Sequence, residues 1–245
     1  MKFSLTKNKK VEFGITFYQI KAEKDFGNVS KGDLGGWVEK KENLSEDGNA
    51  WVHGNAQVYG DALVYGDAQV YGDAQVYGDA WVYGDAWVSG DARVYGDAWV
   101  YGDAWVSGDA RVYGDARVYG NAQVYGDAQV SGNARVYGDA RVSGDARVYG
   151  NAQVYGDAQV SGDAQVYGNA RVYGNALVYG KLKLLSGYFF GIRYKKEEIK
   201  FVNIETNYEL IYKGDAKFGE EDKPSLSGKT VKVELDGVSY EAVIK

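Results

Sequence analysis

The most regular feature of this sequence is a pattern of hydrophobic and polar positions that repeats every six residues. From Gly48 to Gly180 a glycine recurs at every sixth position, and each of the 22 units has the form G-[DN]-A-x-V-[YSH]. Ala and Val lie two positions apart, so in an extended segment both side chains point to one side and the variable residue x points to the other. The pattern predicts a short strand with Ala and Val inside and x outside.

The step between two such strands carries turn residues. It has the form Y-G-D or S-G-D, in which Gly accepts a positive φ and Asp or Asn tolerates turn conformations well. A strand this short buries too little surface to fold alone, so the units must wind into a coil whose successive turns pair through their backbones. The sequence therefore predicts an all-β solenoid.

A longer repeat indicates the size of one turn. The eighteen letters GDAWVYGDAWVSGDARVY occupy residues 78–95 and occur again, unchanged, at residues 96–113. An aliphatic residue followed four places on by a small one resembles the hexapeptide repeat of left-handed parallel β-helices, in which three hexapeptides make one triangular turn. The resemblance implies a left-handed parallel β-helix of about seven turns, in which equivalent residues stack about 4.8 Å apart.

An eighteen-residue turn sorts the outward residues x into three columns, one for each face. The first face carries Leu63, Trp81, Trp99, Arg117, Arg135, Gln153 and Arg171. The second face carries Trp51, Gln69, Trp87, Trp105, Gln123, Arg141, Gln159 and Leu177. The third face carries Gln57, Gln75, Arg93, Arg111, Gln129, Arg147 and Gln165, with no aromatic residue.

The aromatic residues gather around the corner that the first and second faces share. That corner, called the Tyr65 corner below, carries a tyrosine in seven successive turns: Tyr65, Tyr83, Tyr101, Tyr119, Tyr137, Tyr155 and Tyr173. We expect a contiguous patch, the aromatic edge, formed by Trp81, Tyr83, Trp87, Trp99, Tyr101 and Trp105. Its expected size exceeds the apolar patches that monomers usually expose, so it is a candidate contact surface for a protein partner, a glycan or a second copy of the chain. The alternative is a set of cross-strand ladders that only stabilise the coil.

Basic residues continue the same edge, and acidic residues line the corners. Arg117, Arg135 and Arg141 follow the aromatic residues, and we expect them to balance the Asp columns as solvated ion pairs. Of the corner positions 15 are Asp and 7 are Asn. Such columns could attract cations or imitate a phosphate backbone. Turn formation explains them without a ligand, so the sequence predicts no metal site and no cofactor.

The two ends depart from the repeat. Residues 1–47 contain alternating segments that predict strands and a cap on the first turn, which would hide an open β edge. Residues 181–245 predict a small β-rich domain that caps the other end, with Asp236-Gly237 as a hairpin turn. The expected domains are therefore a cap (1–47), a solenoid (48–180) and a C-terminal domain or cap (181–245).

The segment DFGNVSKGDLGGWVEKKENLSEDGNAWV, residues 25–52, resembles the entry segment of the YdcK-type β-solenoid proteins. The matching letters are Asp25, Phe26, Val29, Gly32, Gly35, Gly36, Trp37, Val38, Asn43, Leu44, Ser45, Gly48, Trp51 and Val52. That group is common in bacteria and prophages, and its members are labelled as acyltransferases on fold alone. The resemblance covers the cap and, more loosely, the solenoid.

Composition and charge bound the class of protein. The chain has no cysteine, and it has neither an apolar signal segment nor a run of eighteen apolar residues, which predicts a soluble, cytoplasmic protein. Of its net charge of −6, the repeats carry −8 and each end carries +1, and this acidic balance argues against a nucleic-acid partner.

Four functions are left open by the sequence. A non-enzymatic scaffold of phage or prophage type, binding a protein or itself through the aromatic edge and the C-terminal domain, needs only the features described. A counter-defence protein that captures a host factor, a filament-forming protein and a hexapeptide-type acyltransferase are the alternatives. The resemblance implies a histidine base for the acyltransferase, but the chain has a single histidine, His53, and no loop interrupts the repeats. No catalytic residue is therefore assigned.

Overall fold

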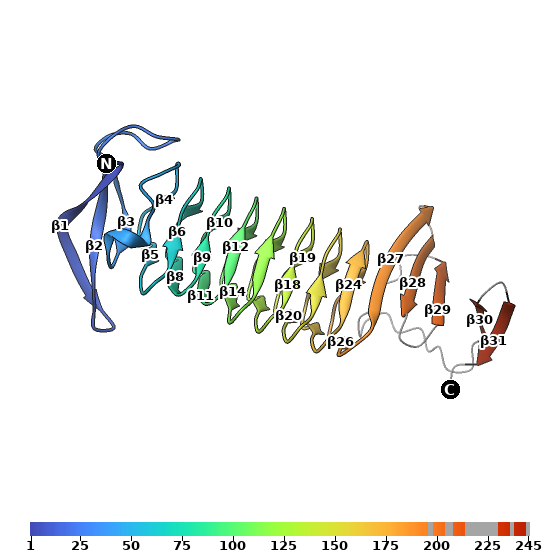
Figure 1. Cartoon of the computed structure of the whole chain (residues 1–245). Helices are drawn as coiled ribbons and strands as arrows, with labels where there is room; N and C mark the ends of the chain where they lie inside the picture. The colour runs from blue at the N-terminus through green and yellow to red at the C-terminus, as the bar shows by residue number, and fades with distance from the viewer. Residues whose placement is uncertain (196–197, 204–207, 214–229, 236–237, 244–245) are drawn as a thin grey trace.

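The chain forms a parallel β-coil that runs from an N-terminal cap to a short antiparallel extension (Figure 1). The computed structural model describes residues 1–195, 198–203, 208–213, 230–235 and 238–243, with side-chain surroundings up to residue 189. Within these residues the only helical element is one short 3-10 helix, η1 (Lys41–Asn43). The all-β parallel solenoid predicted from the repeats is confirmed, and the left-handed sense of the coil stays a prediction.

Each face of the coil is one sheet, and its strands follow one another once per turn. The first face consists of β6 (Leu63–Val64), β9 (Trp81–Val82), β12 (Trp99–Tyr101), β15 (Arg117–Tyr119), β18 (Arg135–Val136), β21 (Gln153–Val154), β24 (Arg171–Gly174) and β27 (Tyr188–Lys195). The second face consists of β4 (Trp51–Val52), β7 (Gln69–Val70), β10 (Trp87–Val88), β13 (Trp105–Val106), β16 (Gln123–Val124), β19 (Arg141–Val142), β22 (Gln159–Val160) and β25 (Leu177–Val178). The third face consists of β5 (Gln57–Val58), β8 (Gln75–Gly78), β11 (Arg93–Gly96), β14 (Arg111–Tyr113), β17 (Gln129–Val130), β20 (Arg147–Val148), β23 (Gln165–Val166) and β26 (Lys183–Leu184).

The register of these sheets is eighteen residues. Trp81 pairs with Trp99, Trp87 with Trp105, and Arg93 with Arg111, all in parallel. Each of the three expected columns of outward residues is therefore a real column, with like positions of successive turns side by side.

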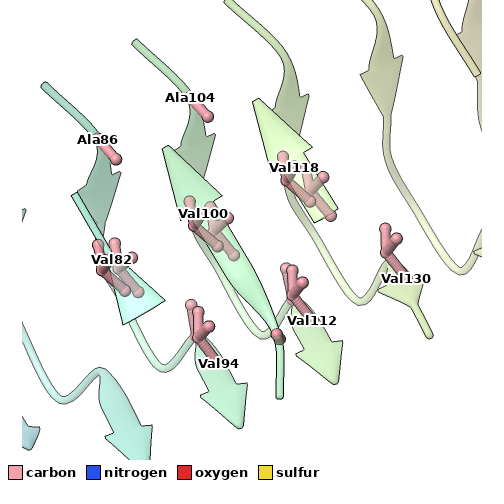
Figure 2. Packing of buried hydrophobic residues seen from close by; sticks show 14 of the residues in the cluster. Val82, Ala86, Val94, Val100, Ala104, Val112, Val118 and Val130 are labelled. Atoms are coloured by element: carbon pink, nitrogen blue, oxygen red, sulfur yellow. The ribbon is translucent and has the colours of Figure 1, made fainter. Parts of the chain in front are cut away.

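The core is a narrow column of Ala and Val. Every Ala and Val of the repeats from Ala50 to Val178 is at most 3% exposed, and the labelled valines and alanines of Figure 2 point into the interior of the coil. Two small side chains per strand fill a coil of this width, which explains why the repeat varies only at its outward positions.

The turns depend on the repeated glycine. Gly102, for example, has a φ of 70°, and a Cβ on it would lie 3.0 Å from the backbone nitrogen of Gly120 in the next turn. Both the positive φ and the close approach of successive turns therefore require glycine at this corner.

The N-terminal cap is a small antiparallel sheet joined to the third face. It consists of β1 (Phe3–Glu12), β2 (Ile15–Ala22) and β3 (Leu34–Val38), and β3 pairs in parallel with β5. A Cβ at Gly35 would lie 2.6 Å from both Ile20 and Trp51, so glycine lets β3 lie close against the first turn.

The parallel pairing continues beyond residue 180. β26 and β27 extend the third and first faces, so each face has eight coil strands and the coil has about eight turns, against the seven predicted from the 22 repeats. β28 (Glu198–Asn203) and β29 (Tyr208–Lys213) then pair antiparallel beside β27. β30 (Thr230–Leu235) and β31 (Val238–Val243) pair antiparallel with each other. Asp236-Gly237, the predicted hairpin turn between them, lies outside the described residues.

Candidate functional site: the aromatic edge

The tryptophans of the aromatic edge form one stacked pair on each of two faces. On the first face, the rings of Trp81 and Trp99 lie 5.3 Å apart with an angle of 5° between their planes. On the second face, Trp87 and Trp105 lie 5.3 Å apart at 7°. Both stacks follow directly from the eighteen-residue register, because each pair occupies the same position in adjacent turns.

These rings are exposed to an unusual degree for their size. Trp81 is 39%, Trp87 40% and Trp105 49% exposed, and all three lie among the exposed large hydrophobic residues of the described part of the chain. Trp99 and the tyrosines Tyr83 and Tyr101 are half-buried.

The Tyr65 corner is a nearly continuous aromatic ladder. Tyr83 and Tyr101 lie 4.9 Å apart with almost parallel planes, and the same stacking recurs along the corner from Tyr65 to Tyr173. Burial raises the pKa of the Tyr83 and Tyr101 hydroxyls above the usual tyrosine value. These hydroxyls therefore stay protonated at neutral pH and can donate hydrogen bonds.

Ring contacts divide the six residues of the aromatic edge into two groups. Tyr83 meets Trp99 edge to face at 6.3 Å, so the Tyr65 corner leans over the first face. Trp87 instead contacts Tyr71, at 5.4 Å, from the corner on the other side of the second face. Among the described residues, no ring contact joins Tyr83 or Tyr101 to Trp87 or Trp105.

On the first face the stacked indole pair lies between Leu63 and Arg117, its neighbours in register. The ring of Tyr65 meets Trp81 edge to face at 6.0 Å, and the guanidinium of Arg117 lies 4.9 Å from the ring centre of Trp99. Each indole also covers one face of the other. The edges of these rings, rather than their faces, are therefore what remains for a partner to contact.

The arginines that continue the aromatic edge carry no acidic partner. Arg117, Arg135 and Arg141 make no ion pair within 4.0 Å with any described residue. The ion pairs expected with the Asp columns are thus absent there. Each corner Asp lies in the turn two positions before x, outside the strand that holds x. Arg117 and Arg135 instead lie next to each other in register.

Trp51 differs from the other tryptophans of its column. It occupies the outward position of the second face, yet it is 1% exposed. Phe26 and Phe3 pack against its ring edge to face, at 5.4 Å and 6.3 Å. The periodicity assigns its direction correctly, but the cap covers it, so Trp51 belongs to the hydrophobic core and not to the exposed surface.

Sequence reasoning missed the residues that close the first turn. In the coil, the carbonyl of each repeat alanine accepts a hydrogen bond from the preceding turn, as Ala68 does from the Trp51 N–H. For the first three alanines this donor comes from the cap: Lys2 Nζ donates to Ala50 (3.0 Å), the Trp37 N–H to Ala56 (2.9 Å) and Asn43 Nδ2 to Ala62 (2.9 Å). One donor on each face thus replaces the missing turn.

Lys2 does this from a buried position. It is 1% exposed, and burial lowers the pKa of its ammonium to about 8. No pattern in residues 1–47 could have indicated this role, because a lysine beside a strand is ordinarily a surface residue.

His53 lies at the capped end of the second face. Its ring stacks on Tyr71 at 4.0 Å, and its Nε2 lies 2.8 Å from Oε1 of Gln69. Burial lowers its pKa below the usual histidine value, with the Gln69 contact acting in the opposite direction. The single imidazole of the chain is therefore neutral at pH 7, and it packs against Tyr71 as an aromatic ring of the same corner does.

Two further observations concern ligands and membranes. The described residues contain no group of three or more His, Asp or Glu side chains arranged to hold a metal ion. None of the described helices has the length and the apolar character needed to cross a bilayer.

Comparison with known families agrees with this geometry. The model of the YdcK β-solenoid repeat matches residues 56–72, 74–90, 92–108, 110–127, 128–144, 140–156, 152–168 and 164–180. The first five matches begin one eighteen-residue turn apart, which is the register of the sheets. No curated protein matches the chain. Together, the repeats and the fold show that the chain belongs to the YdcK β-solenoid repeat family.

Proposed function

We propose that this protein is a non-enzymatic binding scaffold, and that the aromatic edge is its contact surface for a protein partner or for a second copy of the chain. The observation that carries the proposal is the exposure of Trp81, Trp87 and Trp105 on a rod whose other repeat apolar side chains are mostly buried. Exposed tryptophan and tyrosine side chains contribute strongly to protein interfaces, because they bury much area for few rotatable bonds.

Rigidity supports this role. The strands below the aromatic edge pair with the preceding and the following turn, and the rings stack on one another. Side chains that are already ordered lose little entropy when a partner covers them, so more of the contact energy appears as affinity.

The ring orientation favours a protein over a glycan. Stacking of a sugar needs a free aromatic face, whereas the first-face pair lies between Leu63 in register on one side and the guanidinium of Arg117 on the other. Indole edges carry an N–H donor and the positive side of the ring quadrupole, so they suit carbonyl oxygens and aromatic faces.

A scaffold also fits the rest of the chain better than an acyltransferase does. A general base must reach its substrate, and the single histidine is half-buried, stacked on Tyr71 and in contact with Gln69. Filament growth through the first turn is disfavoured by the donors of Lys2 and Asn43, which occupy carbonyls that another coil would need.

The proposal is tested by changing Trp81, Trp87, Trp99 and Trp105 together to Gln. We expect the variant to fold, by far-UV circular dichroism, and to lose either its self-association or the proteins captured with the intact chain. The control is Arg93→Gln with Arg111→Gln on the third face of the same two turns, which should change neither. If light scattering and affinity capture give the same results for the tryptophan variant and the unchanged protein, the aromatic edge is not a contact surface.

A phage or prophage origin and the capture of a host factor belong to the same proposal, and they rest on the resemblance of residues 25–52 to phage-borne proteins. Affinity capture from a bacterial lysate with the full chain, and with a chain that ends at residue 195, tests them. A host protein retained by the full chain alone would assign its binding to residues 196–245.

A further inference from the structure

The first face is divided into two halves of opposite charge. In its first three turns Asp61, Asp79 and Asp97 stand beside the uncharged Leu63, Trp81 and Trp99. Among the described residues only Asp61 of these three has a cationic partner, Lys40 of the cap at 2.6 Å. In the next four turns the face carries three arginines and one aspartate, and its other corner positions are Asn: these residues are Arg117, Arg135, Arg171, Asp115, Asn133, Asn151 and Asn169. The aromatic half is therefore acidic, and the other half is basic.

The third face lacks this division. Its corner position is Asp in six successive turns, from Asp73 to Asp163, and its arginines Arg93, Arg111 and Arg147 are spread between glutamines. The separation of charge along the axis of the coil is thus a property of the first face that the repeat itself does not impose.

We propose that a second copy of this chain docks on the first face in antiparallel orientation. The two-fold axis would run along the strands, between the turn of Trp99 and the turn of Arg117. This proposal rests on the proposed function and names the partner that contacts the part of the aromatic edge on the first face. The arrangement places the acidic half of each copy on the basic half of the other.

The order of residues along the face supports this orientation. Four successive turns carry Trp81, Trp99, Arg117 and Arg135, so an antiparallel copy sets each tryptophan against an arginine. Trp81 then faces Arg135 of the partner subunit, and Trp99 faces Arg117 of the partner subunit. Asp79 and Asp97 stand two positions before Trp81 and Trp99, so each arginine of the partner subunit also comes near a carboxylate.

The corner residues support the same orientation. An antiparallel copy sets Asp79 against Asn133 and Asp61 against Asn151, which leaves Asp97 against Asp115 as the one like-charged match. A parallel copy would instead set Arg117 and Arg135 each against its own image, and like charges directly opposite each other are destabilising. Neither arginine has an acidic partner within the described part of its own chain.

The area of the first face limits the affinity that we expect for the dimer. Six turns of each copy overlap in this arrangement, and six turns at about 4.8 Å by five residues at about 3.3 Å give a surface of roughly 29 by 16 Å. Two copies would therefore bury on the order of 1,000 Å² in total, which is the lower limit for a specific interface. We expect a reversible dimer with a dissociation constant in the micromolar range.

Disulfide cross-linking tests the orientation, because the chain has no cysteine of its own. In the antiparallel pair Leu63 meets Gln153 of the partner subunit. A mixture of the Leu63→Cys and Gln153→Cys variants should thus form a mixed disulfide dimer, whereas neither variant should cross-link alone. The matched control is Gln75→Cys mixed with Gln165→Cys, in the same two turns of the third face, which should not cross-link. Self-linking of the Leu63→Cys variant would show a parallel pair and overturn the proposal.

Charge reversal tests the complementarity. Arg117→Glu with Arg135→Glu should weaken the dimer about tenfold or more in sedimentation experiments. The same exchange of Arg93 and Arg111 on the third face should leave it unchanged. Asp79→Lys with Asp97→Lys should also weaken it, and mixing the two first-face variants should restore a mixed dimer. Equal sedimentation of all variants, or a monomer throughout the micromolar range, would overturn the proposal.

These results are separable from those of the proposed function. If the chain stays monomeric but the tryptophan variant loses a captured protein, the aromatic edge is a contact surface for a foreign partner and the dimer is wrong. If neither changes, both proposals fail.

Discussion

At the scale of single residues, the first turn of the coil needs hydrogen-bond donors for the buried carbonyls that no preceding turn satisfies. An unpaired buried carbonyl costs about 1–3 kcal/mol, so three open carbonyls would destabilise the first turn strongly. Lys2, Trp37 and Asn43 each supply one donor, two from side chains and one from the backbone. The lysine carries the additional cost of a buried charge, which is visible in its lowered pKa of about 8.

This cost gives the protein a specific pH dependence. Because burial lowers the pKa of Lys2 from 10.5 to about 8, the unfolded chain binds more protons than the folded chain between these values, and stability rises with pH there. Above about pH 10 the raised pKa of the half-buried tyrosines, about 12 for Tyr59, acts in the opposite direction. We expect the free energy of unfolding in urea to rise from about pH 8 to about pH 10 and then to fall.

Two variants isolate the contribution of Lys2. Lys2→Met should remove the rise between about pH 8 and pH 10, because no buried ammonium is left to lose its proton, and it should keep the fall at higher pH. Lys9→Met, on an exposed position of β1, should keep both. An unchanged rise in the Lys2→Met variant would contradict this account.

At the scale of secondary-structure elements, a single strand is too short to form a surface alone. The surface of the coil is set by columns of equivalent strands in successive turns. Most strands of the coil comprise two residues, and all except those at the ends of the sheets pair with a strand on both sides. The residue at position x therefore lies beside the residue at position x of the next turn. Trp51 and Trp105 show the consequence. They share the second face and the same repeat position, but the cap covers Trp51, and Trp105 is 49% exposed.

Replacing each of these tryptophans by Ala should therefore have very different costs. Trp51→Ala opens a cavity among Phe3, Phe26 and Gly35 and should lower the free energy of unfolding by about 3–5 kcal/mol. Trp105→Ala loses a stacked ring contact with Trp87 and should cost about 1 kcal/mol. Chemical denaturation of the two variants measures both, and similar costs would show that the cap does not bury Trp51 in solution.

At the scale of the whole molecule, the coil is a stack of equivalent turns. Each turn contacts only its neighbours, so stability grows by one turn and one interface at a time. The identical segments 78–95 and 96–113 make this testable without introducing a new contact.

Deleting residues 96–113 should give a folded rod that is shorter by one turn. At the new junction Trp81 meets Arg117 and Tyr83 meets Tyr119, which reproduces the pairings that Trp99 and Tyr101 make in the intact chain. We expect cooperative unfolding, a β-rich circular dichroism spectrum and an m-value reduced in proportion to the lost surface. Loss of a cooperative transition would mean that the turns are not interchangeable.

The sequence by itself determined the coil. The six-residue pattern and the eighteen-residue duplication predicted the strands, the inward Ala and Val, the three columns and the stacked tryptophans, because a strict period leaves one way to bury the small side chains and pair the backbone. Residues 25–52 also indicated the cap and the family.

Only the tertiary structure decided what depends on contacts between segments far apart in the chain. It buried Trp51 beneath Phe3 and Phe26 and brought Lys2 to the carbonyl of Ala50. It also divided the aromatic edge into two groups of rings and continued the coil through β26 and β27. A repeat determines which residues lie side by side in adjacent turns. The burial of Trp51, the capping of the first turn and the orientation of the aromatic rings depend instead on chain segments that lie outside the repeat or across a corner.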